Sequence, residues 1–217
     1  MPRKNYHHGD LKNALIKAGM EIISKEGLAG LSLRKVASKA GVSHAAPYAH
    51  FADKQALIAA ISTEGYHRLY DQLTAAVVIN EGDPQRILVE AGWSYVQFAL
   101  NDPQRFKVMF SGILEQEKDY PEFREMALKS FELLVTLVKG CQAAGLLAPD
   151  PADMVAVRLW SVVHGFILLL LEGQISHTLL DRMSIRDLVI FMLNEITKKN
   201  KGGLDIPSRT LKGLIVD

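Results

Sequence analysis

Residues 31–54 read LSLRKVASKAGVSHAAPYAHFADK, and they carry the strongest local structural signals of the chain. Ser32 precedes a short apolar-periodic segment and Gly41 follows it, which is typical of a helix with a hydroxyl N-cap and a left-handed glycine at its end. Ser43 lies where it can cap a second short helix, and Asp53 lies where it can cap a longer one. Two short helices joined through a glycine predict a helix-turn-helix.

The second short helix of this pair would be the exposed one. Its first turn carries His44, Ala45 and Ala46, which are small or polar side chains that can approach base edges. The backbone amides after Ser43 favour a nearby phosphate, because a helix N-terminus attracts anions. Pro47 falls at the fourth helical position, where its missing amide removes only the first hydrogen bond of the helix. The pattern favours DNA binding, although helix pairs of this spacing also occur in proteins without that role.

Helical periodicity continues along the rest of the chain. Apolar residues recur mostly at spacings of three and four, and few segments alternate as strands do, so we expect an all-α fold. Asp10 can cap a first helix that ends before Gly27. The expected helices span 11–26, 33–40, a short segment from residue 44, 54–79, 85–101, 103–114, 121–145, 151–174 and 184–199.

Charge is distributed unevenly along the 217 residues. Residues 1–55 hold nine Lys or Arg and four Asp or Glu, a net charge of +5, whereas the remainder holds 16 and 20, a net charge of −4. Since Lys and Arg drive phosphate binding, this asymmetry predicts a small nucleic-acid-binding head on a body with another task; a solvated basic face is the alternative. We place the head at 1–55, the helical body at 56–200 and a tail at 201–217, which is either disordered or packed on the body.

Composition excludes several classes of protein. With 48% hydrophobic and 23% charged residues the chain resembles an ordinary soluble globular protein, so wholesale disorder is excluded. The single cysteine, Cys141, cannot form an intrachain disulfide, and the first residues lack the apolar stretch of a signal peptide. The apolar segment 159–171 is shorter than the roughly 20 residues that span a bilayer, so we interpret it as a buried helix. These features fit a cytoplasmic protein.

Chemistry-bearing residues are sparse. We find no nucleophile-and-base pattern, no His-Glu-x-x-His and no glycine-rich phosphate loop, so we expect neither an enzyme nor a bound cofactor. His44 and His50 would lie on nearly opposite faces of a short helix without acidic or thiol partners, so we expect no metal site. His164 lies four residues after Trp160, where it is either a core histidine or a polar group of a pocket. Cys141 is interpreted as an inert buried thiol, with a redox sensor as the lesser alternative.

The stretch quoted first closely resembles the N-terminal signature of the TetR family of bacterial transcriptional regulators, and the resemblance covers about residues 8–58. The segment LWSVVHG at residues 159–165 looks like a tryptophan-histidine-glycine effector domain found in one branch of that family. The resemblance implies an N-terminal three-helix helix-turn-helix DNA-binding domain. It also implies a C-terminal helical bundle for effector binding and dimerisation, in a bacterial cytoplasmic protein.

Carried over residue by residue, the resemblance implies a DNA-binding set along the predicted helix-turn-helix: Ser32, Arg34, Ser43, His44, Ala45, Ala46, Tyr48, His50 and Lys54. Within this set, Ser32, Tyr48 and Lys54 would hold phosphates. Arg34 would approach the DNA backbone or a base edge, His50 would lie at the backbone, and residues 44–46 would face the major groove.

The resemblance also divides the body into a pocket and an interface. For an effector pocket among the middle helices we expect Trp93, Phe106, Phe110, Phe131, Trp160 and His164. For a dimer interface on the last two long helices we expect Phe166, Leu169, Leu170, Leu188, Phe191 and Met192. The implied function is a homodimeric repressor that binds a pseudo-palindromic operator and is released by a small, partly apolar molecule. A helical interaction protein, or a nonspecific DNA binder without a defined operator, is the alternative.

Overall fold

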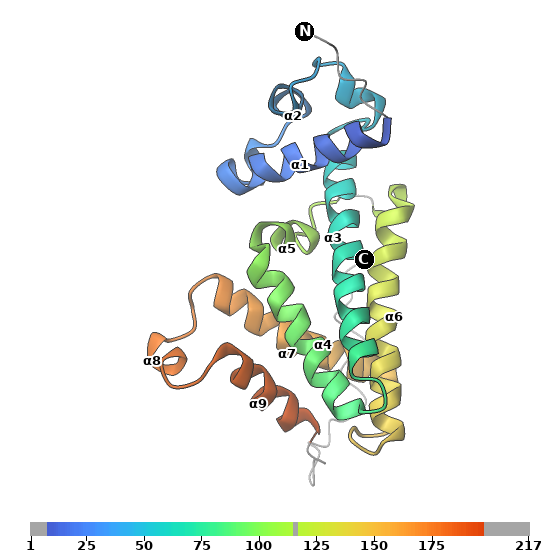
Figure 1. The fold of residues 1–217 in the computed structure, drawn as a ribbon, viewed down its shortest axis with the longest axis vertical. Coiled ribbons are helices and arrows are strands. Elements are labelled where there is room, and N and C mark those ends of the chain that lie inside the picture. Colours follow the sequence, from blue (N-terminus) through green and yellow to red (C-terminus); the bar gives the residue numbers. More distant parts are fainter. Residues whose placement is uncertain (1–7, 115–116, 198–217) are drawn as a thin grey trace, which may run out of the picture.

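The computed structural model of this chain describes residues 8–114 and 117–197. Over these residues it contains nine α-helices, three short 3₁₀ helices and no strand, which confirms the all-α prediction (Figure 1). The α-helices are α1 (His8–Glu26), α2 (Leu33–Ala40), α3 (Lys54–Ile79), α4 (Pro84–Asn101), α5 (Pro103–Met109), α6 (Pro121–Ala143), α7 (Ala152–Leu171), α8 (His177–Leu180) and α9 (Ile185–Thr197). The 3₁₀ helices are η1 (Leu28–Gly30), η2 (Ala46–Ala49) and η3 (Glu117–Asp119).

The head consists of α1, α2 and η2 at one end of the molecule, and α3 runs from it into the body (Figure 1). Leu15, Val36, Phe51 and Leu57 are buried in the core of the head. Gly19 lets α1 pack closely on α3, since a Cβ added there would lie 3.1 Å from Ile61 Cδ1. The boundary expected at residue 55 therefore falls in the first turn of a helix that both parts share.

The body is a bundle in which α3 packs on α4, α5 and α6, while α7 packs on α4 and α6. The short α5 lies between the head and the bundle and contacts α1 as well as α3 (Figure 1). Gly65 allows this approach, because a Cβ added there would overlap Met109 Sδ. On the other side, α9 packs against α4 and α7.

Most of the predicted caps are present. The Ser32 side chain accepts a hydrogen bond from the Lys35 amide at 3.3 Å, and Asp53 accepts one from the Ala56 amide at 2.8 Å. Gly41 ends α2 in the left-handed conformation, with φ of 71° and ψ of 29°. The predicted Asp10 cap is wrong, since α1 already begins at His8.

The predicted second helix of the helix-turn-helix is instead the single 3₁₀ turn η2, and Ser43 does not cap it. Ala45 is the N-cap, and no side chain caps η2. The cause is Pro47, which has no amide to bond to the Ser43 carbonyl and whose ring would crowd that carbonyl in an α-helix. The chain forms i to i+3 bonds instead, from Ala46 N to Ser43 O and from Tyr48 N to Ala45 O.

Three other expectations on the body need correction. α5 ends at Met109 rather than near 114, and the four-residue α8 was not predicted. Residues 159–171 belong to α7, which is not wholly buried, since Leu168 and Leu169 are exposed. By length and composition, α7 is the one helix of the described ranges that could cross a membrane. The tail at 201–217 lies outside the described residues.

Candidate functional site

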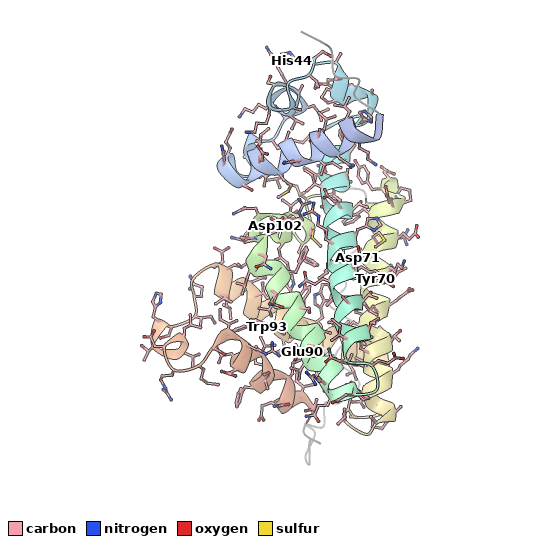
Figure 2. The ribbon with its side chains drawn as sticks, in the orientation of Figure 1. His44, Tyr70, Asp71, Glu90, Trp93 and Asp102 are labelled. Carbon is pink, nitrogen blue, oxygen red and sulfur yellow. The ribbon has the colours of Figure 1, made fainter. Side chains whose placement is uncertain are left out.

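The residues expected to meet DNA lie on α2, η2 and the turn between them. Arg34, Ser43, His44, Ala45 and Tyr48 are all exposed, and Tyr48 is 60% exposed. Pro47 is buried beneath them and anchors the turn in the core of the head. Figure 2 shows His44 at the end of the head far from the body. The tertiary structure thus places these side chains at one exposed end of the molecule.

A hydrogen bond that the sequence did not predict fixes His44. Its Nε2 atom lies 3.1 Å from the hydroxyl of Ser38 on α2. That hydroxyl donates its only proton to the Arg34 carbonyl at 3.1 Å, so its oxygen accepts from His44. The ring proton of His44 is therefore on Nε2, and Nδ1 is the nitrogen that remains for other partners.

Several basic groups of the head are engaged within the head itself. The Lys54 ammonium donates to the Leu28 carbonyl at 2.9 Å, and so ties η1 to the start of α3. Lys35 pairs with Glu26 at 2.6 Å, joining α2 to α1. These contacts therefore occupy part of the positive charge on which the prediction of phosphate binding was based.

Lys39 and His50 also bear on the predicted DNA-binding surface of the head. Lys39 pairs with Glu21 at 2.9 Å and holds the pKa of that carboxyl below its ordinary value. The Nε2 atom of His50 is buried and forms no hydrogen bond, and its ring packs beside Phe51. This nitrogen of His50 is thus directed into the protein rather than toward a DNA backbone.

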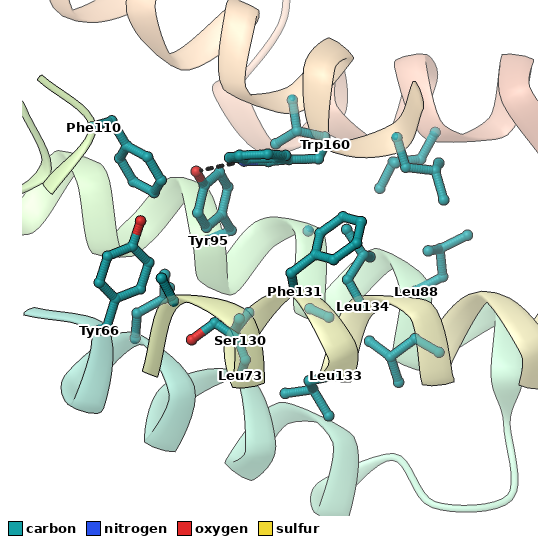
Figure 3. Close-up of a pocket in the computed structure, with 18 residues that line it drawn as sticks. Tyr66, Leu73, Leu88, Tyr95, Phe110, Ser130, Phe131, Leu133, Leu134 and Trp160 are labelled. Atoms are coloured by element: carbon teal, nitrogen blue, oxygen red, sulfur yellow. Dashed lines mark hydrogen bonds between the residues drawn. The ribbon is translucent and has the colours of Figure 1, made fainter. Parts of the chain in front are cut away.

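A cavity opens in the body between α3, α4, α6 and α7 (Figure 3). The space that the centre of a water molecule can reach is about 180 Å³. One ordered water needs only about 10–15 Å³ of such space, so the cavity is large enough for a small organic molecule. Its lining residues are Tyr66, Leu69, Leu73, Leu88, Ala91, Gly92, Tyr95, Phe110, Ala127, Ser130, Phe131, Leu133, Leu134, Leu137, Leu159, Trp160, Val163 and Leu193.

Three of the six residues expected in the pocket line this cavity, namely Phe110, Phe131 and Trp160. The other three do not. Phe106 is fully buried, with its ring centre 5.2 Å from that of His164. Trp93 lies beneath the guanidinium of Arg186 on α9, 5.7 Å from ring centre to Cζ.

His164 does not line the cavity, but a hydrogen-bond chain of three residues connects it to two residues that do. Trp160 Nε1 donates to Tyr95 Oη at 3.0 Å, and Tyr95 Oη lies 2.8 Å from His164 Nδ1. The indole N–H can only donate, so the Tyr95 hydroxyl accepts from Trp160 and keeps its own proton; with the ring proton of His164 on Nε2, Nδ1 accepts the hydrogen bond from Tyr95. Burial lowers the pKa of His164 and raises that of Tyr95, so both groups are neutral near pH 7.

Tyr95, the middle residue of this hydrogen-bond chain, was not among the residues expected in the pocket. Trp93 was expected in the pocket because of its size, although it lies on another face of α4. A usable signal was the spacing of Leu88, Ala91, Gly92 and Tyr95, which places one residue of each helical turn on the same face.

The helix α5 joins the cavity to the head. Phe110 at its C-terminal cap lines the cavity, and Phe106 packs against His164. Arg105 is buried and donates from Nε to Asp102 Oδ2 at 2.8 Å, while its Nη1 lies 3.5 Å from Glu64 Oε2 on α3. Because α5 also contacts α1, a change at the cavity wall can reach the head through packed elements.

Several apolar side chains on α7 and α9 are exposed, and we call them the apolar face. Met154, Val157, Leu168 and Leu169 are exposed on α7, and Phe191 is 56% exposed on α9. Of the residues expected at an interface, Leu169 and Phe191 lie on this face, and Leu170 and Met192 are half-buried. Phe166 and Leu188 are instead buried in the chain's own core, so they are not available to a partner.

Neither metal nor thiol chemistry has a site in the described ranges. No group of three or more His, Cys, Asp or Glu side chains there could hold a metal ion. Cys141 is buried and donates to the Pro84 carbonyl at 3.4 Å. Burial raises the pKa of its thiol, which disfavours the reactive thiolate.

Two family models match the chain. The model described as "Bacterial regulatory proteins, tetR family" matches residues 15–61, which lie in the head and the start of α3. The model described as "Tetracyclin repressor-like, C-terminal domain" matches residues 88–193, which include the helices around the cavity from α4 onward.

Individual relatives match over most of their length. The HTH-type transcriptional regulator YobS of Bacillus subtilis is 24% identical over 75% of this chain and 80% of its own. The HTH-type transcriptional repressor BepR of Brucella suis is 24% identical over 80% of this chain and 87% of its own. A solved structure from Rhodococcus sp. RHA1, of unknown function, is 32% identical with a TM-score of 0.75, over 89% of this chain and 96% of its own.

Proposed function

This chain belongs to the TetR family of bacterial regulatory proteins, and we propose that it is a homodimeric repressor whose operator is released when a small molecule enters the cavity. As a member of that family it is a transcriptional regulator with a helix-turn-helix head. The repression, the pseudo-palindromic operator, the effector, the dimer and the location in the bacterial cytoplasm are parts of the proposal.

The observation that carries the proposal is the position of α5. Its C-terminal end supplies Phe110 to the cavity wall, and the helix also packs on α1 of the head. A ligand that displaces Phe110 must therefore move or strain a helix on which the head rests. A ligand releases DNA only by its different affinity for the two arrangements, and a coupling of about 1–3 kcal/mol changes operator affinity about 5-fold to 150-fold.

The exposed apolar face of α7 and α9 supports a homodimer. A second copy placed around a twofold axis would cover these side chains with its own, and exposed apolar groups of this kind are typical of protein interfaces. Two heads held in this way would read half-sites in successive major grooves, about 34–36 Å apart. Leu169 and Phe191 are the central contacts of the proposed interface.

Repression rather than activation is supported by the relative from Brucella suis, which is described as a repressor. Within the head, Ser32 and Tyr48 are assigned to phosphates, Arg34 to the DNA backbone or a base edge, and residues 44–46 to base edges. Lys54 has a structural role first, because its ammonium is bound to the Leu28 carbonyl.

The test is selection of bound fragments from genomic DNA of the source organism with the purified full chain. The enriched fragments are then titrated at several salt concentrations. We expect a pseudo-palindrome, two chains per site and a steep salt dependence. Binding that is sensitive to salt but indifferent to sequence would instead support a nonspecific DNA binder.

A further inference from the structure

We propose that the cavity takes an uncharged ligand, with a hydrocarbon body and a hydrogen-bond donor such as a hydroxyl, and that it excludes the corresponding carboxylate. This inference rests on the proposed function only in treating the ligand as an effector. Binding of the ligand to the cavity involves only the body, so it can be measured without DNA.

The first support is the lining itself. Its residues include leucines, alanines, valine and aromatic rings, and no Asp, Glu, Lys, Arg or His stands among the lining residues of the described chain (Figure 3). A carboxylate brought into such a wall would lose its water without gaining an opposite charge, which is strongly unfavourable. The wall therefore selects against charge whatever the shape of the ligand.

The second support is that three cations on the surrounding helices, Arg105, Lys129 and Arg186, are engaged elsewhere. Arg105 on α5 is held by Asp102 and Glu64. Lys129 on α6 lies over the ring of Tyr70, with its Nζ 4.7 Å from the ring centre, and Tyr70 is not a lining residue. Arg186 on α9 pairs with Glu90 at 2.5 Å. Drawing any of them into the cavity would break an existing contact.

The third support is that His164 cannot supply a positive charge at low cost. Its Nδ1 accepts the proton of Tyr95, whose oxygen already accepts from Trp160. If Nδ1 were protonated, the tyrosine proton would lose its acceptor in a buried position. The hydrogen-bond chain therefore keeps the imidazole neutral behind the wall.

Two of the polar side chains of the wall, Ser130 and Tyr95, favour a donor on the ligand. Ser130 donates its proton to the Met126 carbonyl at 2.8 Å, and Tyr95 donates its proton to His164. Each of these two oxygens has accepting capacity left and no proton to offer. A hydroxyl can donate to such an oxygen, whereas a carboxylate can only accept.

The probe is a pair of compounds that share one hydrocarbon chain, decanol and decanoate, titrated calorimetrically into the full chain without DNA at a pH well above the pKa of the acid. We expect decanol to bind and decanoate to bind at least about 100-fold more weakly. As the pH is lowered toward the pKa of the acid, the affinity of the acid should rise as its neutral form accumulates. Equal affinities at high pH, tighter binding of decanoate, or no binding of decanol would each overturn the proposal.

Two variants locate the binding and test its electrostatic cause. Ala127→Trp fills the cavity and should abolish decanol binding, with an unchanged unfolding midpoint as the sign that the body is intact. Leu134→Lys places an ammonium in the wall and should raise the affinity for decanoate about tenfold, whereas the matched Leu134→Met should not. A Leu134→Lys protein that still rejects decanoate while it remains folded would contradict the electrostatic cause.

A separate measurement distinguishes this inference from the proposed function. Operator fragments from the selection are bound to the protein, and decanol is added. Binding of decanol without release of DNA would leave the ligand class intact and would refute release by the effector. Absence of any operator would refute the proposed repressor, while the calorimetric comparison would still decide the ligand class.

Discussion

His44 Nε2 lies 3.1 Å from Ser38 Oγ, so a side-chain hydrogen bond joins the turn that carries the exposed residues of the head to α2. Only one ring nitrogen, Nδ1, is left to meet a base. In the neutral ring this nitrogen accepts a hydrogen bond, which suits the amino groups of cytosine and adenine rather than the acceptors of guanine.

We therefore predict that Ser38→Ala broadens base preference at the position that His44 reads. Without the serine oxygen the ring can rotate and exchange tautomers, so donor and acceptor edges become equally available. The measurement is selection from a random DNA library with wild type, Ser38→Ala and His44→Ala. An unchanged preference in Ser38→Ala, in a protein with wild-type stability, would contradict the assigned role.

Substitutions of Tyr48 and Lys54 should change different properties of the protein, although the family resemblance implies that both residues bind phosphates. Tyr48→Ala should weaken binding across all sequences and leave the free energy of unfolding within about 0.5 kcal/mol, because the side chain is exposed. Lys54→Met should destabilise the head by about 1 kcal/mol through loss of the bond to the Leu28 carbonyl. Urea unfolding and fluorescence anisotropy on one labelled operator separate the two effects.

His164 should make stability depend on pH. Burial holds its pKa in the folded chain below the ordinary value of about 6.5, so between the two values the unfolded chain binds more protons. Stability is therefore full above about pH 6.5 and falls as the pH is lowered toward the folded pKa. His164→Asn keeps an acceptor for Tyr95 but does not titrate, and should flatten this part of the profile. Equal profiles for wild type and variant, from thermal unfolding at several pH values, would refute the assignment.

Arg105 should contribute to both stability and coupling. Arg105→Met leaves the carboxylates of Asp102 and Glu64 without their partner, and we expect a loss of about 1–3 kcal/mol, since both are partly exposed to water. Because the same residue fastens α5 to α3, the variant should also release operator less completely when ligand binds. Arg105→Lys, which keeps the charge but not the fork of donors, is the control; it should recover part of the stability.

The apolar face of α7 and α9 should govern assembly. Leu169→Glu with Phe191→Glu should convert a dimer into a folded monomer and lower operator affinity at least about 100-fold, since each half-site is then bound alone. Leu128→Glu places the same charge on an exposed leucine of α6 and should leave the dimer intact. Light scattering during size-exclusion chromatography reports the mass. A double variant that remains dimeric would place the interface elsewhere.

Local sequence signals were enough to predict the helical class and most of the element boundaries, because these signals lie within a few residues of one another. Ser32 and Asp53 each bond to an amide three residues ahead, and Gly41 adopts the backbone conformation that its position requires. Another local effect explains why the prediction of an α-helix at η2 was wrong. Pro47 acts on the Ser43 carbonyl four residues before it, and its effect extends beyond the first hydrogen bond, so η2 is a 3₁₀ turn.

The choice of residues that line the cavity, and of the apolar residues that stay exposed on α7 and α9, depends on packing between distant helices. Tyr95 meets Trp160 and His164 across 65 and 69 residues of sequence, and no local pattern states which face of α4 is turned toward α7. For the same reason Phe166 and Phe191, equally apolar in sequence, differ completely in burial. Hydrophobic periodicity specifies that a helix has a face to bury, but packing of distant helices decides what covers that face.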